Sequence, residues 1–149
     1  MYEMETLQRK NGQPYLKKKM VCEDEKFANS AKEVWKILNT CFSLGKQTEE
    51  KVYMLALNTK CKVIGAFEIS HGCLDGSYAN PREIFMKALL CNAYGIIITH
   101  NHPSGDTTPS DEDKQNFENL KRAGKIIGIE VLDSIIISRS EYYSLASEC

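Results

Sequence analysis

The spacing of hydrophobic residues predicts a chain that alternates between helices and strands. From residue 31 to residue 42 apolar side chains recur every three or four positions, which predicts an amphipathic helix with Asn29 or Ser30 as its cap and Gly45 as its stop. Residues 52–57 are continuously apolar and predict a buried strand. A turn at 58–60 leads into a second strand over 61–70, so the two strands form a hairpin.

The second half of the chain continues this alternation. Asn80 and Pro81 predict the start of a helix that runs to about residue 93. The β-branched run 95–99 predicts a strand buried on both faces, and residues 135–138 predict another strand. A last helical turn is expected over 141–146. Helices that alternate with strands predict an α/β fold, and the hairpin makes its β-sheet mixed rather than parallel.

The first residues of the chain have a different pattern. Residues 1–14 are polar and contain an Asn-Gly pair and a proline, so we expect a flexible arm, followed by a short strand over 15–22. The sequence has the length of one domain. We therefore predict an N-terminal arm over residues 1–22 and a single domain over residues 23–149.

Composition narrows the function classes. The formal net charge is −1, so no global basic field favours nucleic acid, and 42% hydrophobic residues are enough for a substantial core. The six cysteines form no Cys-x-x-Cys pair, and several lie in apolar segments, as reduced core cysteines do. No run has the length of a membrane span, and the N-terminus has no signal-peptide pattern. We expect a cytoplasmic protein with free thiols and no membrane partner.

The string THNHPSGDTTPSDED, residues 99–113, contains the strongest chemical signal. His100 and His102 follow the apolar run 95–99, and side chains two apart on a strand point the same way, so both imidazoles can converge while Asn101 points elsewhere. Asp113 follows eleven residues after His102. Two histidines and a carboxylate are ligands that zinc accepts, and three protein ligands leave a fourth position for water.

The third ligand comes from a second element. Thr108 and Pro109 predict the N-cap and first residue of a helix that ends near Gly124. Counting back along its apolar stripe by threes and fours places Ser110 and Asp113 on the face toward the core. A carboxylate that faces inward needs a partner, and a metal is one. The alternative is a capping box of Ser110 and Asp113 with no metal, beside histidines that belong to the core.

The motif resembles that of the JAB/MPN (JAMM) metalloprotease superfamily, in which His-x-His is followed by seven residues, the first a proline, and then by Ser-x-x-Asp. The segments GAFEISHG, NPREIFMKALLCNAYGIIITHNHPSGD and IIGIEVLDSIIIS resemble the RadC-like branch, and the similarity covers about residues 30–144. The resemblance implies a mixed sheet flanked by helices, with cytidine deaminase-like layering. It also implies a Zn²⁺ ion held by His100, His102 and Asp113.

The resemblance further implies a glutamate from an earlier strand, which matches Glu68. Alternation along residues 63–70 leaves Glu68 as the only charge on either face of that strand, although an exposed charge near a strand end is common. In the implied mechanism Glu68 carries protons between water and the leaving amine, and the Ser110 hydroxyl steadies the oxyanion. His71 is expected to be a turn residue outside the site.

The resemblance implies a zinc-dependent peptidase or isopeptidase acting on a peptide or protein substrate. The alternative is an accessory protein of DNA repair or mobile elements with little or no peptidase activity. A zinc deaminase would need His-x-Glu and Pro-Cys-x-x-Cys, which the chain lacks. Scaffold relatives have lost metal ligands, whereas every motif position is filled here.

Two departures from the family pattern affect these expectations. Longer relatives carry an N-terminal helix-hairpin-helix region that binds DNA, and we expect this chain to be a short form without it. Relatives also tend to have Asp-His where this chain has Asp133 and Ser134. Loss of a residue that supports metal ligands typically costs about 10- to 100-fold in affinity or activity, so Ser134 predicts a weaker site.

Overall fold

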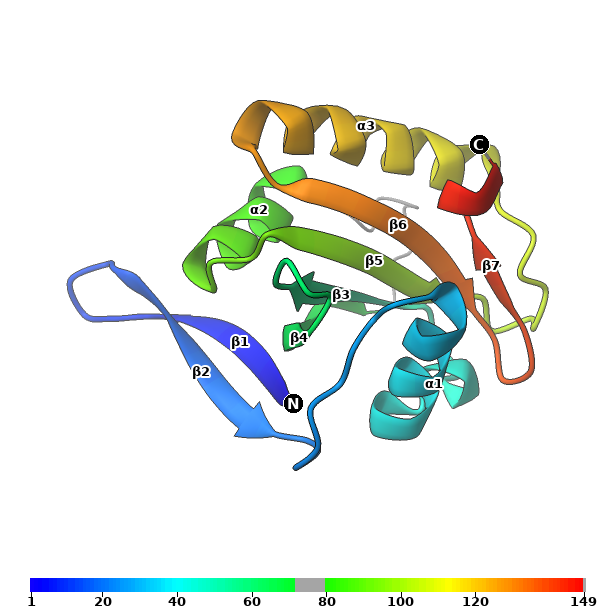
Figure 1. Cartoon of the computed structure of the whole chain (residues 1–149), viewed down its shortest axis with the longest axis horizontal. Coiled ribbons are helices and arrows are strands. Elements are labelled where there is room, and N and C mark those ends of the chain that lie inside the picture. Colours follow the sequence, from blue (N-terminus) through cyan, green and yellow to red (C-terminus); the bar gives the residue numbers. More distant parts are fainter. Residues whose placement is uncertain (72–79, 149) are drawn as a thin grey trace.

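The computed structural model of the chain describes residues 1–71 and 80–148 and shows one mixed sheet with helices on both faces (Figure 1). The strands lie in the order β2-β1-β4-β3-β5-β6-β7. They are β1 (Tyr2–Gln8), β2 (Pro14–Met20), β3 (Lys51–Leu57), β4 (Val63–His71), β5 (Gly95–Asn101), β6 (Glu130–Ile137) and β7 (Tyr142–Ser144). The helices are α1 (Ala31–Phe42), α2 (Pro81–Leu90) and α3 (Asp111–Ile127), with 3₁₀ turns η1 (Leu44–Lys46) and η2 (Ala146–Glu148). The predicted α/β fold with a mixed sheet is confirmed.

Two hydrophobic layers enclose the sheet, one on each face. Side chains of α2 and α3 pack with β3 and β5 residues such as Met54 and Ile98 on one face. Side chains of α1 pack on the other face with the alternate residues, among them Tyr53 and Leu55. Figure 1 shows α2 and α3 on one side of the strands and α1 on the other. Burial on both faces explains why β3 and β5 read as continuous apolar runs.

The central strands have both parallel and antiparallel neighbours. The predicted hairpin of β3 and β4 is antiparallel, and β3 also pairs antiparallel with β5, whereas β5 and β6 are parallel. All seven residues of β5 are buried. Its ladder with β3 reaches as far as the pair Val52 and His100. The first histidine of the motif therefore belongs to the sheet and is held in place by two neighbouring strands.

The N-terminal segment differs from the prediction. Instead of a flexible arm over residues 1–14, β1 and β2 form an antiparallel hairpin, and Glu3 pairs in parallel with Ala66 of β4. Met4 of β1 is buried in the core, so the hairpin gains stability from packing that its polar sequence does not reveal. The short strand expected over 15–22 is β2, which begins one residue earlier and ends two residues earlier than expected.

Helix α3 begins and ends later than its sequence pattern predicts. Its N-cap is Ser110 rather than Thr108, because Ser110 and Asp113 cap each other. Gly124 does not end the helix. A Cβ atom there would lie 2.5 Å from the Ile129 carbonyl oxygen, so glycine permits close packing of the helix against the segment that leads into β6. The helix ends at Gly128, which adopts the left-handed conformation, with φ of 89°.

The C-terminal segment also corrects the prediction. Residues Tyr142–Ser144 form β7, which pairs antiparallel with β6, where a helical turn over 141–146 was expected. The Asp133 carboxylate accepts hydrogen bonds from the Ser144 hydroxyl and from the Ala146 N–H, and this fixes β7 against β6. Among the described residues, no helix is long and apolar enough to cross a membrane.

Candidate metal centre

The structure brings His100, His102 and Asp113 together where β5 ends and α3 begins. The Nε2 atoms of the two histidines lie 3.1 Å apart. One carboxylate oxygen of Asp113 lies 3.3 Å from His100 Nε2, and the other lies 3.4 Å from His102 Nε2. His100 and Asp113 are buried, and His102 is half-buried. The spacing in the sequence therefore becomes a compact triangle of ligand atoms.

These distances fit a divalent cation. Two ligand atoms about 2.1 Å from a zinc ion, at a tetrahedral angle, lie about 3.4 Å apart, close to the separations within the triangle. The orientation of His102 fits as well. Its Nδ1 lies 2.8 Å from the Asp106 carbonyl oxygen, which can only accept, so Nδ1 carries a proton and Nε2 is the nitrogen that would bind a metal.

The capping box and the ligand cluster coexist at Asp113. Its Oδ2 accepts a hydrogen bond from the Ser110 N–H at 2.9 Å, and the Ser110 hydroxyl oxygen accepts one from the Asp113 N–H at 3.1 Å. The same carboxylate faces both histidines. Capping and ligation, treated as alternatives at the sequence level, are therefore compatible. The cap fixes the first turn of α3 and aims the carboxylate at the histidines.

Electrostatics keep this carboxylate ionised. Burial acts to raise the pKa of Asp113, but hydrogen bonds with His100 and His102 outweigh it and hold that pKa well below its usual range. The pKa of His102 is raised, chiefly by its hydrogen bond with Asp113 and against the effect of burial. An ionised carboxylate is the form that binds a metal, and binding of a cation would displace protons from the histidine nitrogens that face it.

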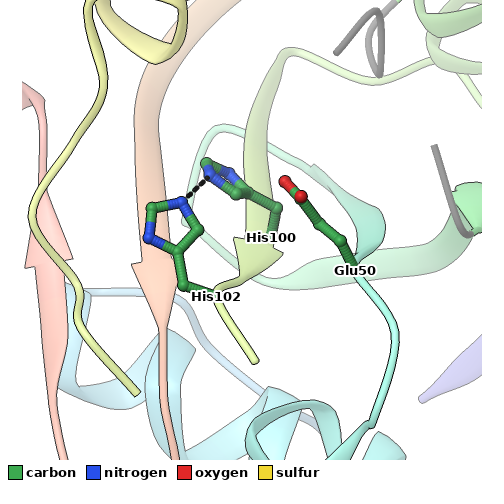
Figure 2. Close-up of side chains that lie close together, drawn as sticks. All are labelled: Glu50, His100 and His102. Atoms are coloured by element: carbon green, nitrogen blue, oxygen red, sulfur yellow. Dashed lines mark hydrogen bonds between the residues drawn. The ribbon is translucent and has the colours of Figure 1, made fainter. Parts of the chain in front are cut away.

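A further carboxylate, Glu50, joins the histidine pair. One ligand atom each from Glu50, His100 and His102 lie within 4.8 Å of one another, and Figure 2 shows the three side chains pointing toward a common space. Glu50 stands two residues before Val52, the ladder partner of His100. Because alternate residues of an extended segment face the same side, Glu50 lies on the His100 side of the sheet. This group of residues can hold a metal ion.

Sequence reasoning missed Glu50 and selected Glu68, which the structure places elsewhere. Glu68 pairs with Tyr53, and Tyr53 packs in the layer on the α1 face, whereas Val52 and His100 belong to the opposite face. Glu68 Oε1 lies 3.8 Å from Lys51 Nζ, and its side chain is 36% exposed. The sheet therefore separates Glu68 from the histidine pair. The signal for Glu50 is the β3–β5 register, which the sequence alone does not contain.

The remaining candidate residues have simpler positions. Ser110 is exposed beside Asp113 at the start of α3. His71 is the last residue of β4, and residues 72–79, which follow it, lie outside the described residues. Ser134 is buried on β6 and pairs with Ile98, two residues before His100 on β5. Ser134 therefore lies on the same face of the sheet as the site, level with a residue two positions before His100.

A cleft opens beside His102. It has a volume of about 500 Å³ and lies between η1, the loop after β5 and the turn between β6 and β7. Lys46 and Arg139 line it together with His102, Pro103 and small or polar residues, and none of the described residues that line it is acidic. The half-buried imidazole of His102 forms part of its wall, so the cleft gives solvent and other molecules access to the site.

Comparison with known proteins places this fold and site in a family. Residues 28–149 match the family model described as "RadC-like JAB domain", so the chain belongs to that family. A "UPF0758 protein" of Thermotoga maritima is 42% identical over 113 residues, covering 76% of this chain and 51% of the relative. One of Clostridium tetani is 50% identical over 97 residues, covering 65% and 42%. The chain therefore spans about half the length of the curated relatives it matches.

Proposed function

We propose that the protein is a zinc-dependent hydrolase that cleaves peptide or isopeptide amide bonds. The observation that carries this proposal is the triangle of His100, His102 and Asp113 with a further carboxylate, Glu50, beside the histidines. Three ligands and an open fourth position are typical of catalytic rather than structural zinc sites. Membership of the RadC-like JAB family supports the same chemistry, because residues 99–113 resemble the metal motif of the JAB/MPN metalloprotease superfamily.

Each side chain has a defined task in this proposal. Zinc bound to the histidines and Asp113 would supply a Lewis acid and lower the pKa of water toward neutrality. Glu50 accepts a proton from the attacking water and returns it to the leaving amine. The exposed hydroxyl of Ser110 still has its proton to donate, since its oxygen accepts from the Asp113 N–H, and that proton stabilises the oxyanion. Glu68 has no role in the reaction.

The substrate would lie in the cleft beside His102. This cleft is open to solvent and reaches His102 from the side of η1 and the β6–β7 turn. A volume of about 500 Å³ is within the range of about 300–1,000 Å³ typical of small-molecule sites, so a few residues of an extended peptide fit. Lys46 and Arg139 favour a substrate segment with carboxylate groups.

The test is hydrolysis of defined amides by the zinc-loaded protein. Purified protein is incubated with a peptide library and with isopeptide-linked lysine substrates, with zinc or with chelator, and products are identified by mass spectrometry. We expect zinc-dependent cleavage that His100→Ala abolishes. Cleavage that survives both chelator and His100→Ala would exclude this site as its source. A zinc-loaded protein that cleaves none of these substrates would favour the accessory role instead.

A further inference from the structure

Asn101, the residue between the two histidines, makes an unusual pair of contacts. Its side chain is 1% exposed and points away from the histidines, since it lies between them on β5. Its Oδ1 accepts a hydrogen bond from the Lys51 N–H at 2.7 Å, and its Nδ2 donates one to the Glu49 carbonyl oxygen at 3.0 Å. Both groups of one buried amide are therefore used on residues 49 and 51, which flank Glu50.

These contacts begin where the ladder between β3 and β5 stops. The last pair of that ladder is Val52 and His100. One residue further, the side-chain amide of Asn101 supplies the donor and the acceptor that a backbone peptide would have supplied. Among the common side chains, only amides offer both groups in this planar arrangement. Asn101 thus extends the hydrogen bonding between β5 and the segment that leads into β3.

We propose that Asn101 is the positioning residue for Glu50. Tethering the backbone on both sides of Glu50 fixes the point from which its side chain projects, and that side chain reaches the histidine pair (Figure 2). The inference rests on the proposed function, in which Glu50 carries the proton. The middle residue of His-x-His, Asn101, then has a task other than metal binding. It positions Glu50, the general base beside the metal ligands.

Thr99 provides a matched control. It lies on the same face of β5 as Asn101, is fully buried, and its hydroxyl donates a hydrogen bond to the Tyr53 carbonyl oxygen at 3.2 Å. Thr99→Val therefore removes one buried hydrogen bond between the same two strands without touching the segment that holds Glu50. A general loosening of the sheet would affect Thr99→Val and Asn101→Ala alike, whereas loss of Glu50 placement is specific to Asn101→Ala.

The kinetic test compares Asn101→Ala, Thr99→Val, Glu50→Gln and the double variant of Asn101 and Glu50. Loss of a residue that orients a group at a metal site typically costs about 10- to 100-fold, and we expect Asn101→Ala to lower kcat by this factor with KM and zinc affinity unchanged. Thr99→Val should keep kcat. The double variant should be no slower than Glu50→Gln alone, because Asn101 acts through Glu50. An additive loss in the double variant would overturn the proposal.

Two further readouts do not depend on hydrolysis, so they remain informative if the proposed function fails. Amide hydrogen exchange at Lys51 should accelerate in Asn101→Ala and not in Thr99→Val. A crystal structure of zinc-loaded Asn101→Ala should show the Glu50 carboxylate displaced from the histidines, and an unmoved carboxylate would contradict the proposal. If Asn101→Ala does not fold, Asn101→Ser serves the same test: its shorter, uncharged side chain cannot reach both residue 49 and residue 51, so displacement of Glu50 and a loss of kcat are again expected.

Discussion

Glu50 precedes β3 and Glu68 lies in the second half of β4, so both are toward the open end of the β3–β4 hairpin, yet they lie on opposite faces of the sheet. Glu50 has ligand atoms of both histidines within 4.8 Å, and Glu68 lies beside Lys51 on the face that packs with Tyr53. Only a group within hydrogen-bond reach of the reacting water can carry its proton. The proton carrier of the proposed reaction should therefore be Glu50.

The two glutamine variants separate these residues. We expect Glu50→Gln to keep zinc and lose turnover by about 10²- to 10⁴-fold, the usual contribution of a general acid–base group. Glu68→Gln should keep both zinc and turnover, because Glu68 lies on the opposite face of the sheet from the histidines and its ion pair with Lys51 is partly exposed. Steady-state kinetics and zinc content of the two proteins check this. The reverse pattern, with Glu68→Gln inactive, would restore the assignment made from the sequence.

At this site the sequence predicted the residues whose positions depend on short-range spacing alone. His100, His102 and Asp113 were predictable because strand alternation and helical spacing act within a few residues. Glu50 was not, because its place depends on the register that joins β3 to β5 across an intervening helix. Asn101 was expected to point away from the histidines, but its partners at residues 49 and 51 depend on the same register.

Helix α3 owes its close approach to β6 to Gly124. A Cβ atom at this position would lie 2.5 Å from the Ile129 carbonyl oxygen and 2.9 Å from a Val131 methyl. Alanine raises helix propensity by about 1 kcal/mol, but overpacking against backbone that cannot rotate away costs about 1–3 kcal/mol. We expect Gly124→Ala to lower the free energy of unfolding, measured by urea denaturation. Lys125→Ala, on the exposed side, is the control and should stay within about 0.5 kcal/mol of wild type.

The contact between β6 and β7 should make stability depend on acid pH. Burial raises the pKa of Asp133, against hydrogen bonds from Ser144, Ala146 and Ser134, so the folded protein holds this proton more tightly than the unfolded chain. The contribution of Asp133 to stability is then greatest below its unfolded pKa of about 3.9 and falls as pH rises through the folded pKa.

Asp133→Asn isolates this effect. The variant keeps a carbonyl oxygen for the two backbone N–H groups and has no titration, so its free energy of unfolding should rise relative to wild type as pH increases through the acid range. Urea denaturation of both proteins at a series of pH values from about 3 to 7 measures the difference. Parallel stability curves would show that Asp133 does not titrate differently in the folded and unfolded states.

For the whole molecule, the order of elements was more predictable than their edges. The helical spacing of apolar residues in 31–42 and the continuous apolar run 52–57 were enough to predict these elements. The pattern of buried positions along a segment distinguishes a helix from a strand. Strand β1, and with it the N-terminal hairpin, was missed because β1 is mostly polar and depends on a parallel contact with β4 and on the burial of Met4. β7 was missed because the Asp133 contacts that hold it are not local.

Zinc should also stabilise the molecule as a whole. The ligands come from β5 and α3, so a bound ion links the helix to the sheet beyond the packing of Phe117 and Leu120. A ligand that binds only the folded state adds about 2.7 kcal/mol at a hundredfold excess over its Kd. We expect this difference between zinc-loaded and chelated protein in urea denaturation. Glu68→Gln should show the same gain, and Asp113→Asn should show little of it.

The site itself is tested by counting zinc. Protein purified with zinc and dialysed against metal-free buffer is analysed by mass spectrometry of the metal, beside His100→Ala, Asp113→Asn and Glu68→Gln. We predict about one zinc ion per chain in the wild type and in Glu68→Gln, and almost none in His100→Ala or Asp113→Asn, because three ligands hold the ion. Wild-type protein without zinc, or His100→Ala with as much zinc as wild type, would contradict a metal centre at the end of β5.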